Sequence, residues 1–270
     1  MNNQTVCLLE KHFETAFAAP DGIKKLRELI LTLAMQGKLV PQDPNDPPAS
    51  ELLKEIEAEK QRQIKEKKIR KPKKLPPIKP EEVPYEVPEG WEWVRLGNFI
   101  YLEMGQSPAS KYYNQEKKGI PFFQGKADFG QKHPSPRYWC TNPKKYAYPN
   151  DILLSVRAPV GPTNIASIKC CIGRGLAALR PVAGVPEIYV NYLMMGFRKK
   201  LESYATGTTF SAVSKKSIEE LIIPVPPLPE QHRIVAKIDQ LMARCDELEQ
   251  QIDVATSTQT ELLDAVMVQV

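Results

Sequence analysis

The C-terminal part of the chain carries an apolar repeat that only a long helix satisfies. Between residues 232 and 266, apolar or small residues recur at alternating steps of four and three, broken once at Gln259. These positions are Ile234, Ile238, Leu241, Cys245, Leu248, Ile252, Ala255, Leu262 and Val266. A mean spacing of about 3.5 residues is typical of a coiled coil. A helix from residue 230 to the end would measure about 60 Å, more than one compact domain needs. We therefore predict a spacer or dimerisation helix over residues 224–270.

Two helices followed by a proline-rich strap are predicted over residues 1–90. Apolar residues share one helical face over residues 21–36, where Asp21 offers an N-terminal cap. Ser50 offers a cap for a second helix over residues 51–68. From there to residue 90, six prolines favour an extended strap.

The middle of the chain, residues 91–223, has the sequence pattern of a domain that mixes strands and helices. Short runs rich in β-forming residues alternate with Gly, Pro and Asn, which indicates strands separated by turns. The runs are Trp91–Leu96, Ile120–Gln124, Ile152–Val156, Ile165–Cys171 and Leu176–Arg180. Helices are predicted over residues 187–203 and 214–220. The expected fold class is therefore α+β, with one globular mixed α/β domain beside long helices.

The net charge of +5 conceals an uneven distribution. Residues 91–223 hold 18 Lys and Arg against 9 Asp and Glu, whereas residues 224–270 hold 3 against 8. A basic domain of this kind has enough cations for several phosphate contacts. The sequence therefore predicts that the middle domain binds nucleic acid and that the acidic C-terminal helix serves another purpose.

Several classes of protein are excluded by the composition. No run of 18 apolar residues exists, so no membrane span is expected, and the N-terminus lacks the pattern of a signal peptide. The five cysteines and three histidines are scattered without a metal-binding spacing. We therefore expect a reduced, cytoplasmic protein with no metal site and no disulfide framework.

Candidate DNA-binding residues lie where cations are interleaved with amides, hydroxyls and aromatic rings. Phosphates are bound by cations, and base edges are read by Arg, Lys, Asn, Gln and Ser side chains. The candidates in the domain are Gln106, Ser107, Lys111, Lys117, Lys118, Gln124, Lys126, Lys132, Arg137 and Arg157. The neighbouring aromatic residues Tyr112, Tyr138 and Trp139 are alternatively explained by packing in the core or at its rim.

A second group of candidates follows Gly207. Small hydroxyl residues beside a glycine let backbone amides approach a phosphate, and two lysines follow at the predicted start of a helix. This group consists of Thr208, Thr209, Ser211, Lys215 and Lys216. An ordinary helix cap at Ser214 is compatible with the same sequence. The basic run over residues 65–74 is expected to supply nonspecific attraction at most.

No catalytic site is expected on this chain. The sequence contains neither a glycine-rich phosphate loop nor a GxSxG motif. The segment Asn142-Pro143-Lys144-Lys145 lacks the Pro-Pro-aromatic sequence with which adenine methyltransferases stack a flipped base. An autonomous nuclease or methyltransferase is therefore the least favoured interpretation.

Four segments of the chain resemble a known family. They are Gly90-Trp91-Glu92-Trp93-Val94-Arg95-Leu96-Gly97, the run from Pro149 to Arg157, the loop over residues 207–211, and Ile222-Ile223-Pro224-Val225-Pro226-Pro227-Leu228-Pro229-Glu230-Gln231 with the helix that follows. Together with Gly37-Lys38-Leu39-Val40-Pro41-Gln42, they resemble the specificity subunit of type I restriction–modification enzymes.

The resemblance implies a non-catalytic protein with defined partners. Such subunits carry two target recognition domains, each reading half of an interrupted DNA site, on helices that form an antiparallel coiled coil. They dock adenine-N6 methyltransferase subunits, which bind S-adenosylmethionine, and a restriction subunit, which uses ATP and Mg²⁺. No cofactor is implied for this chain itself.

The sequence departs from that family in containing a single recognition domain, as a natural half-subunit or a truncated chain would. The leading hypothesis is a half-subunit that pairs with itself through the helix over residues 232–266 and reads a symmetric interrupted site. The alternative is a scaffold or antirestriction decoy that binds the methyltransferase subunit without reading DNA.

Overall fold

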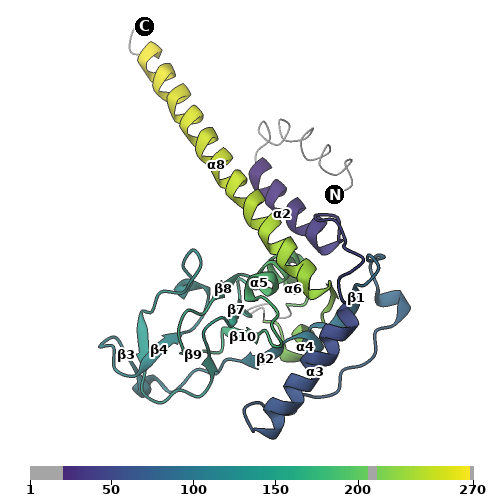
Figure 1. Ribbon diagram of the computed structural model, residues 1–270. Coiled ribbons are helices and arrows are strands. Elements are labelled where there is room, and N and C mark those ends of the chain that lie inside the picture. The colour runs from purple at the N-terminus through teal and green to yellow at the C-terminus, as the bar shows by residue number, and fades with distance from the viewer. Residues whose placement is uncertain (1–20, 206–211, 268–270) are drawn as a thin grey trace. The chain divides into compact units, whose positions relative to one another are not determined.

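The computed structural model describes residues 21–205 and 212–267, without the side chains at 262, 263, 265 and 266. The described chain has a mixed α+β fold with three small sheets and a long C-terminal helix (Figure 1), which confirms the predicted fold class. It divides into two compact units, one made from the segments before residue 43 and after residue 232, and the other from residues 43–232.

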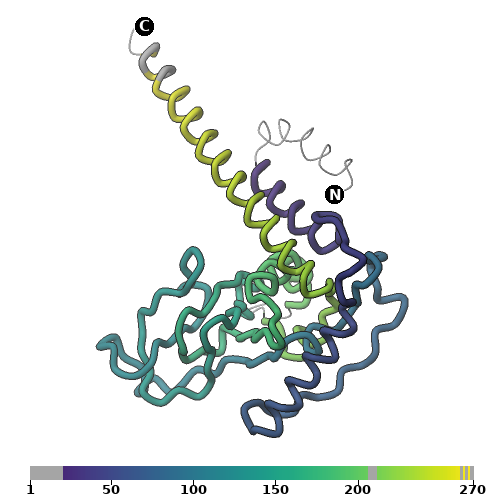
Figure 2. The backbone as a smooth tube through the Cα atoms, in the orientation of Figure 1, coloured from purple at the N-terminus to yellow at the C-terminus, as the bar shows by residue number. Residues whose placement is uncertain are grey.

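The first unit is an antiparallel helix pair. Helix α2 (Gly22–Met35) lies alongside α8 (Leu228–Met267), which begins in the second unit and continues through the first (Figures 1 and 2). Arg27 of α2 fixes the register, since its guanidinium donates to Asp246 at 2.6 Å and Glu249 at 2.7 Å. Both helices bury apolar positions of the predicted repeats, namely Ile23, Leu26, Ile30 and Leu33 on α2 and Ile234, Ile238 and Cys245 on α8.

The predicted caps of the two N-terminal helices are wrong. Asp21 precedes α2 in a left-handed conformation, and its side chain makes no capping hydrogen bond. Helix α3 (Ala49–Lys65) begins before Ser50, because Pro48 with its fixed φ occupies the N-cap position. Beyond α3, the strap contains only one turn of 3₁₀ helix, η1 (Pro80–Glu82), among the residues up to Gly90.

The second unit is built around three sheets. Its two-stranded sheet pairs β1 (Glu92–Arg95) with β11 (Ile222–Val225) in antiparallel register. The four-stranded sheet has the order β2 (Tyr101–Met104), β10 (Leu176–Arg180), β7 (Ile152–Ser155) and β8 (Thr163–Ile165). The five-stranded sheet has the order β3 (Tyr113–Asn114), β5 (Tyr138–Cys140), β4 (Ile120–Phe123), β9 (Cys170–Ile172) and β6 (Tyr146–Ala147). One buried cluster draws Phe123, Leu153 and Leu176 from the two larger sheets, so these sheets share a core.

Two predicted elements of this unit are divided in the structure. The apolar run over residues 165–171 forms parts of β8 and β9, which lie in different sheets and are separated by the exposed Ser167–Lys169 turn. The helix over residues 187–203 is broken at Phe197 into α5 (Glu187–Gly196) and α6 (Arg198–Ser203), directly after a glycine. The short helix α7 (Lys215–Glu219) is capped by Ser214, whose Oγ accepts the Ser217 N–H at 3.1 Å. Helix α4 (Leu96–Phe99) and the 3₁₀ turns η2 (Ser110–Tyr112) and η3 (Lys126–Asp128) complete the unit.

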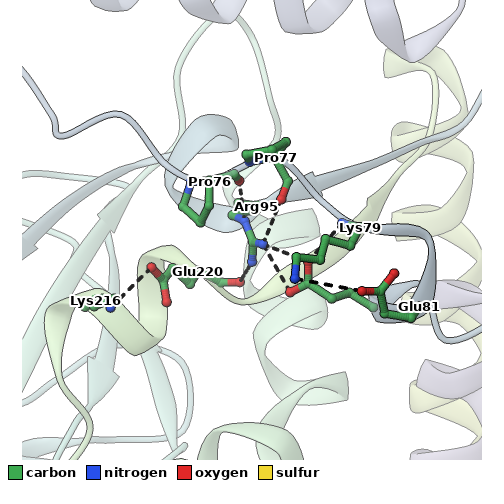
Figure 3. Close-up of polar contacts among 8 residues, drawn as sticks. Pro76, Pro77, Lys79, Glu81, Arg95, Lys216 and Glu220 are labelled. Atoms are coloured by element: carbon green, nitrogen blue, oxygen red, sulfur yellow. Dashed lines mark hydrogen bonds and ion pairs between the residues drawn. The ribbon is translucent and has the colours of Figure 1, made fainter.

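The buried guanidinium of Arg95 holds the strap in place (Figure 3). Its Nε donates to the Pro76 carbonyl at 2.7 Å, and its Nη2 donates to the Pro77 carbonyl at 3.2 Å. The same Nη2 contacts the Glu82 carboxylate at 3.0 Å, while Nη1 donates to the Glu220 carbonyl at the end of α7 at 2.9 Å. A buried cation is tolerated only when its donors are satisfied in this way.

Replacing Arg95 by Met is expected to lower the free energy of unfolding by about 1–3 kcal/mol, because the variant leaves partly buried carbonyls of the strap and of α7 without donors. Denaturant unfolding of the whole chain measures the loss. The matched control is Arg62→Met, which removes an exposed arginine paired with Glu59 and should hardly change stability. An Arg95→Met protein as stable as the wild type would contradict the role given to the guanidinium.

A buried lysine joins α3 to the rest of its unit. Lys60 is 3% exposed, and its ammonium donates to the carbonyls of Gly97 at 2.8 Å and Asn98 at 2.7 Å. Burial lowers the pKa of Lys60 from 10.5 to about 8. The charged form is therefore less favourable in the folded protein than in the unfolded chain.

This pKa shift predicts an alkaline gain in stability. Between the two pKa values the unfolded chain binds more protons, so the contribution of Lys60 to stability rises with pH. Relative to Lys60→Met, the wild type should gain about 2 kcal/mol between roughly pH 8 and pH 10. Urea unfolding of both proteins at several pH values measures the difference, and a constant difference over this range would contradict the shift.

Candidate nucleic-acid interface

A polar cavity opens where four strands of the second unit end. Its volume is about 240 Å³, and its lining consists of Ser107, Gln124, Gly125, Lys126, Ser155, Arg157, Ala158, Arg174 and Gly175. Strands β4 and β9 are parallel neighbours, and β2 and β7 are both antiparallel to β10 and hence point the same way. The residues that follow each of these four strands therefore converge on one edge of the sheets.

Two glycines let the chain segments around the cavity approach closely. A Cβ at Gly105 would lie 2.1 Å from the carbonyl oxygen of Gly173, and one at Gly175 would lie 2.2 Å from that of Gln124. The segments are joined by backbone hydrogen bonds, such as that from the Gly173 N–H to the Phe123 carbonyl at 2.8 Å. Only glycine fits at these positions. The close approach of the segments places their neighbouring side chains around the cavity.

The lining side chains carry positive charge without a compensating acid. Lys126, Arg157 and Arg174 have no ion pair with any of the described residues, and no Asp or Glu is among the residues that line the cavity. Elsewhere in the unit, Arg137 and Arg180 are each held by a buried aspartate. Unpaired cations beside hydroxyl and amide groups create a site for an anion with hydrogen-bonding edges.

Local hydrogen bonds set the positions of these cations. Ser155 Oγ donates to the carbonyls of Arg157 at 3.1 Å and Pro159 at 2.8 Å, which holds the turn after β7. Arg157 also pairs with Ala212 in an isolated antiparallel bridge. The backbone N–H of Arg174 donates to Ser107 Oγ at 3.2 Å, which makes these two lining residues neighbours.

Four of the predicted DNA-binding residues, Ser107, Gln124, Lys126 and Arg157, meet in this cavity. Gln106 is exposed beside Ser107. The predicted residues Thr208, Thr209 and Ser211 lie outside the described residues.

The remaining predicted lysines are exposed but do not line the cavity. Lys111 lies over the Tyr112 ring at 5.1 Å, Lys117 over the Trp139 ring at 6.0 Å, and Lys118 pairs with Glu116 at 2.7 Å. Lys132 is exposed in the loop before β5. On α7, each lysine pairs with an acid four residues later, Lys215 with Glu219 at 3.3 Å and Lys216 with Glu220 at 3.9 Å.

Arg137 is held by an aspartate that the sequence did not single out. Its Nε and Nη2 donate to Asp128 Oδ1 at 2.9 and 2.7 Å, and this hydrogen bonding raises the pKa of the guanidinium. The aromatic neighbours favour the packing explanation, since Tyr112 and Tyr138 contact the buried cluster of Phe122, Cys140 and Cys171.

Arg174 and Ser155 were missed by the sequence-based prediction. Arg174 stands between two glycines directly after a buried strand. That context is a usable signal, because a long charged side chain flanked by glycines has no neighbouring side chain to pack against. Ser155 ends an apolar strand and gives no comparable signal.

The described residues offer neither a metal centre nor a membrane span. No group of three His, Cys, Asp or Glu side chains within residues 21–205 and 212–267 is placed to hold a metal ion. Over the same residues, no helix combines the length and apolar character needed to cross a bilayer.

The described chain thus combines an α+β unit that has a cationic cavity at a sheet edge with a long C-terminal helix. The chain belongs to the family of type I restriction modification DNA specificity domains, whose family model matches residues 88–255. This finding confirms the resemblance seen in the sequence.

Individual relatives agree with this assignment. The chain is 33% identical over 271 residues to the EcoAI specificity subunit and 36% identical over 294 residues to the EcoEI specificity subunit, both from Escherichia coli. Each match covers 95% of this chain and 46% of the relative, so the chain spans about half the length of these curated relatives. The crystal structure of the HsdS subunit from Thermoanaerobacter tengcongensis matches with a TM-score of 0.61 and 36% identity, over 93% of this chain and 51% of that one.

Proposed function

We propose that this chain is a non-catalytic DNA-specificity component of a type I restriction–modification system. The observation that carries the proposal is the convergence of Lys126, Arg157 and Arg174 on one polar cavity without an acidic partner among the described residues. In the proposed arrangement, residues 91–223 are the target recognition domain and read one half of an interrupted site. Residues 1–90 supply the N-terminal helices and strap, and residues 224–270 form the spacer.

The cavity offers both kinds of contact that sequence-specific binding requires. Cations at its rim suit phosphate oxygens, which fix the position of the protein on the duplex. Gln124, Ser107 and Arg174 offer donors and acceptors for base edges, and an arginine suits a guanine in the major groove. The non-reading decoy is less favoured, because it gives no reason for a cationic cavity.

Membership of the family suggests which partner subunits this chain binds. A solved type I restriction–modification system, studied for its complex assembly, contains a chain that matches this one with a TM-score of 0.63 and 36% identity. We infer that this chain likewise docks methyltransferase and restriction subunits. The cofactors of the system, S-adenosylmethionine, ATP and Mg²⁺, would belong to those partners.

Replacing the cavity cations one at a time should weaken DNA binding in distinguishable ways. The salt slope is the dependence of the logarithm of the binding constant on the logarithm of the salt concentration. Losing one cation that contacts a phosphate reduces its magnitude by about 0.9, equally for all DNA sequences. A cation that reads a base costs about 1–3 kcal/mol for the preferred sequence and relaxes the preference at one position. We expect the first result for Lys126→Gln and Arg157→Gln, and the second for Arg174→Gln.

The measurement is selection from a randomised duplex pool, followed by binding titrations at several salt concentrations. Lys54→Gln is the control, since it removes an exposed cation on α3 outside the proposed domain. The double variant Lys215→Gln with Lys216→Gln tests the predicted phosphate contacts on α7. If all three cavity variants bind like the wild type, the cavity is not the DNA site.

Self-association through α8 is the second part of the proposal. The helix is exposed at every position from 253 to 261, including Val254 at 66%, and Met267 is 75% exposed. A bare helical segment of this length needs a second helix for its stability. Of the predicted dimer contact residues in the C-terminal part of α8, Ile252 is half-buried, and the side chains of Leu262 and Val266 lie outside the described residues.

Sedimentation of the full chain should therefore show a dimer, and Val254→Lys should weaken it. Methylome mapping in cells that express the chain with its methyltransferase should then reveal a symmetric interrupted motif. A strict monomer that also fails to bind the methyltransferase subunit would refute this part of the proposal.

A further inference from the structure

We infer that Arg137 does not contact DNA but acts through Asp128 to position the Gln124–Lys126 loop, which forms one wall of the cavity. The inference rests on the proposed function, because it concerns how the site recognises its sequence. Arg137 thereby becomes a positioning residue, in place of the DNA-contacting role that its sequence neighbourhood indicates.

The two carboxylate oxygens of Asp128 bind different groups, one the backbone of the loop and the other the side chain of Arg137. Oδ2 accepts the backbone N–H groups of Gln124 at 2.7 Å and Gly125 at 3.4 Å. Oδ1 accepts Nε and Nη2 of Arg137 at 2.9 and 2.7 Å. The Asp128 side chain is 2% exposed, so it has no access to water that would replace a lost partner.

On one side the loop backbone packs against Gly173 and Gly175, and on its exposed side it is held by this carboxylate. Gln124, Lys126 and Ala127 are exposed, and a Cβ added at Gly125 would meet no atom within 4 Å. The hydrogen bonds to Asp128 therefore fix the direction in which Gln124 and Lys126 leave the backbone. Both of these side chains line the cavity.

One edge of the Arg137 guanidinium is committed to this bridge, although the side chain as a whole is 56% exposed. Its two-pronged edge, formed by Nε and Nη2, faces Asp128 and is the edge that would otherwise grip a phosphate. Turning it toward DNA would leave a buried carboxylate without its cation, which costs more than an exposed phosphate contact returns. The loss of Arg137 is therefore expected to act on the loop rather than on the count of phosphate contacts.

Two variants of Arg137 separate positioning from phosphate binding. In Arg137→Gln, positioning predicts that affinity for the preferred duplex falls roughly 5- to 150-fold, the range for one base contact, while nonspecific affinity and the salt slope stay unchanged. Arg137→Lys keeps the charge but not the two-pronged geometry, so positioning predicts the same loss of preference. A phosphate contact predicts instead that the Gln variant lowers the salt slope by about 0.9 and that the Lys variant keeps most of the affinity.

Asp128→Asn gives results of opposite sign under the two explanations. Positioning predicts that it lowers affinity for the preferred duplex, and that combining it with Arg137→Gln adds no further loss, because both act on one loop. A phosphate contact predicts that releasing Arg137 raises nonspecific affinity and the salt slope. Thermal unfolding of each variant checks that it is folded. If Asp128→Asn does not fold, the two Arg137 variants decide between the two explanations.

The outcomes also separate this inference from the proposed function. A wild-type chain that binds all duplexes equally overturns both. A wild-type chain with a sequence preference that survives in both Arg137 variants overturns only the positioning role. Lys54→Gln serves again as the control for the loss of one exposed cation.

Discussion

A buried arginine determines the path of the least regular part of this protein. The strap has almost no secondary structure of its own, and its prolines remove backbone donors that would otherwise join a sheet. Arg95 compensates by donating from one guanidinium to carbonyls of the strap and of α7. Because α7 leads directly into β11, the partner of β1, the same contacts hold together the sheet that precedes the long helix.

The same physical solution recurs near the candidate site. Asp128 and Asp151 are buried carboxylates, each bound by an arginine and by backbone N–H groups. In both cases the charged pair organises a turn, at Gln124–Gly125 for Asp128 and at Tyr148 for Asp151. The buried ion pairs of this unit therefore hold loops in place. The cations around the cavity, by contrast, have no ion-pair partner among the described residues.

Local patterns in the sequence were sufficient for the longer helices and for four strands, β1, β4, β7 and β10, whereas the short strands β2, β3, β5, β6 and β11 gave no recognised pattern. The repeat through Ile234, Ile238 and Cys245 predicted α8, because a periodicity of about 3.5 residues follows from local geometry alone. The apolar run over residues 165–171 was misread as one strand, since only tertiary pairing shows that its two ends lie in different sheets.

The sequence predicted only part of the candidate site, because the site too depends on contacts between distant segments. Ser107, Gln124, Lys126 and Arg157 were identified by residue type, but the cavity brings together positions almost 70 residues apart in the chain. The ion pair of Arg137 could not be predicted, because its partner, Asp128, lies nine residues away and becomes a neighbour only when the loop folds. Arg174 was overlooked because Gly-Arg-Gly also has the composition of an ordinary turn.

The glycines around the cavity have a consequence for how such a protein diverges. At Gly105 and Gly175 the chain segments around the cavity pack backbone against backbone, so these contacts do not depend on the side chains at the rim. Point substitutions at Gln124 or Arg174, which are exposed and whose side chains form no hydrogen bond or ion pair with another described residue, would alter the proposed readout without moving the strands beneath. If the cavity reads DNA as proposed, a lineage that carries these glycines can acquire new targets one residue at a time, and an engineer can vary Gln124 and Arg174 within an unchanged scaffold.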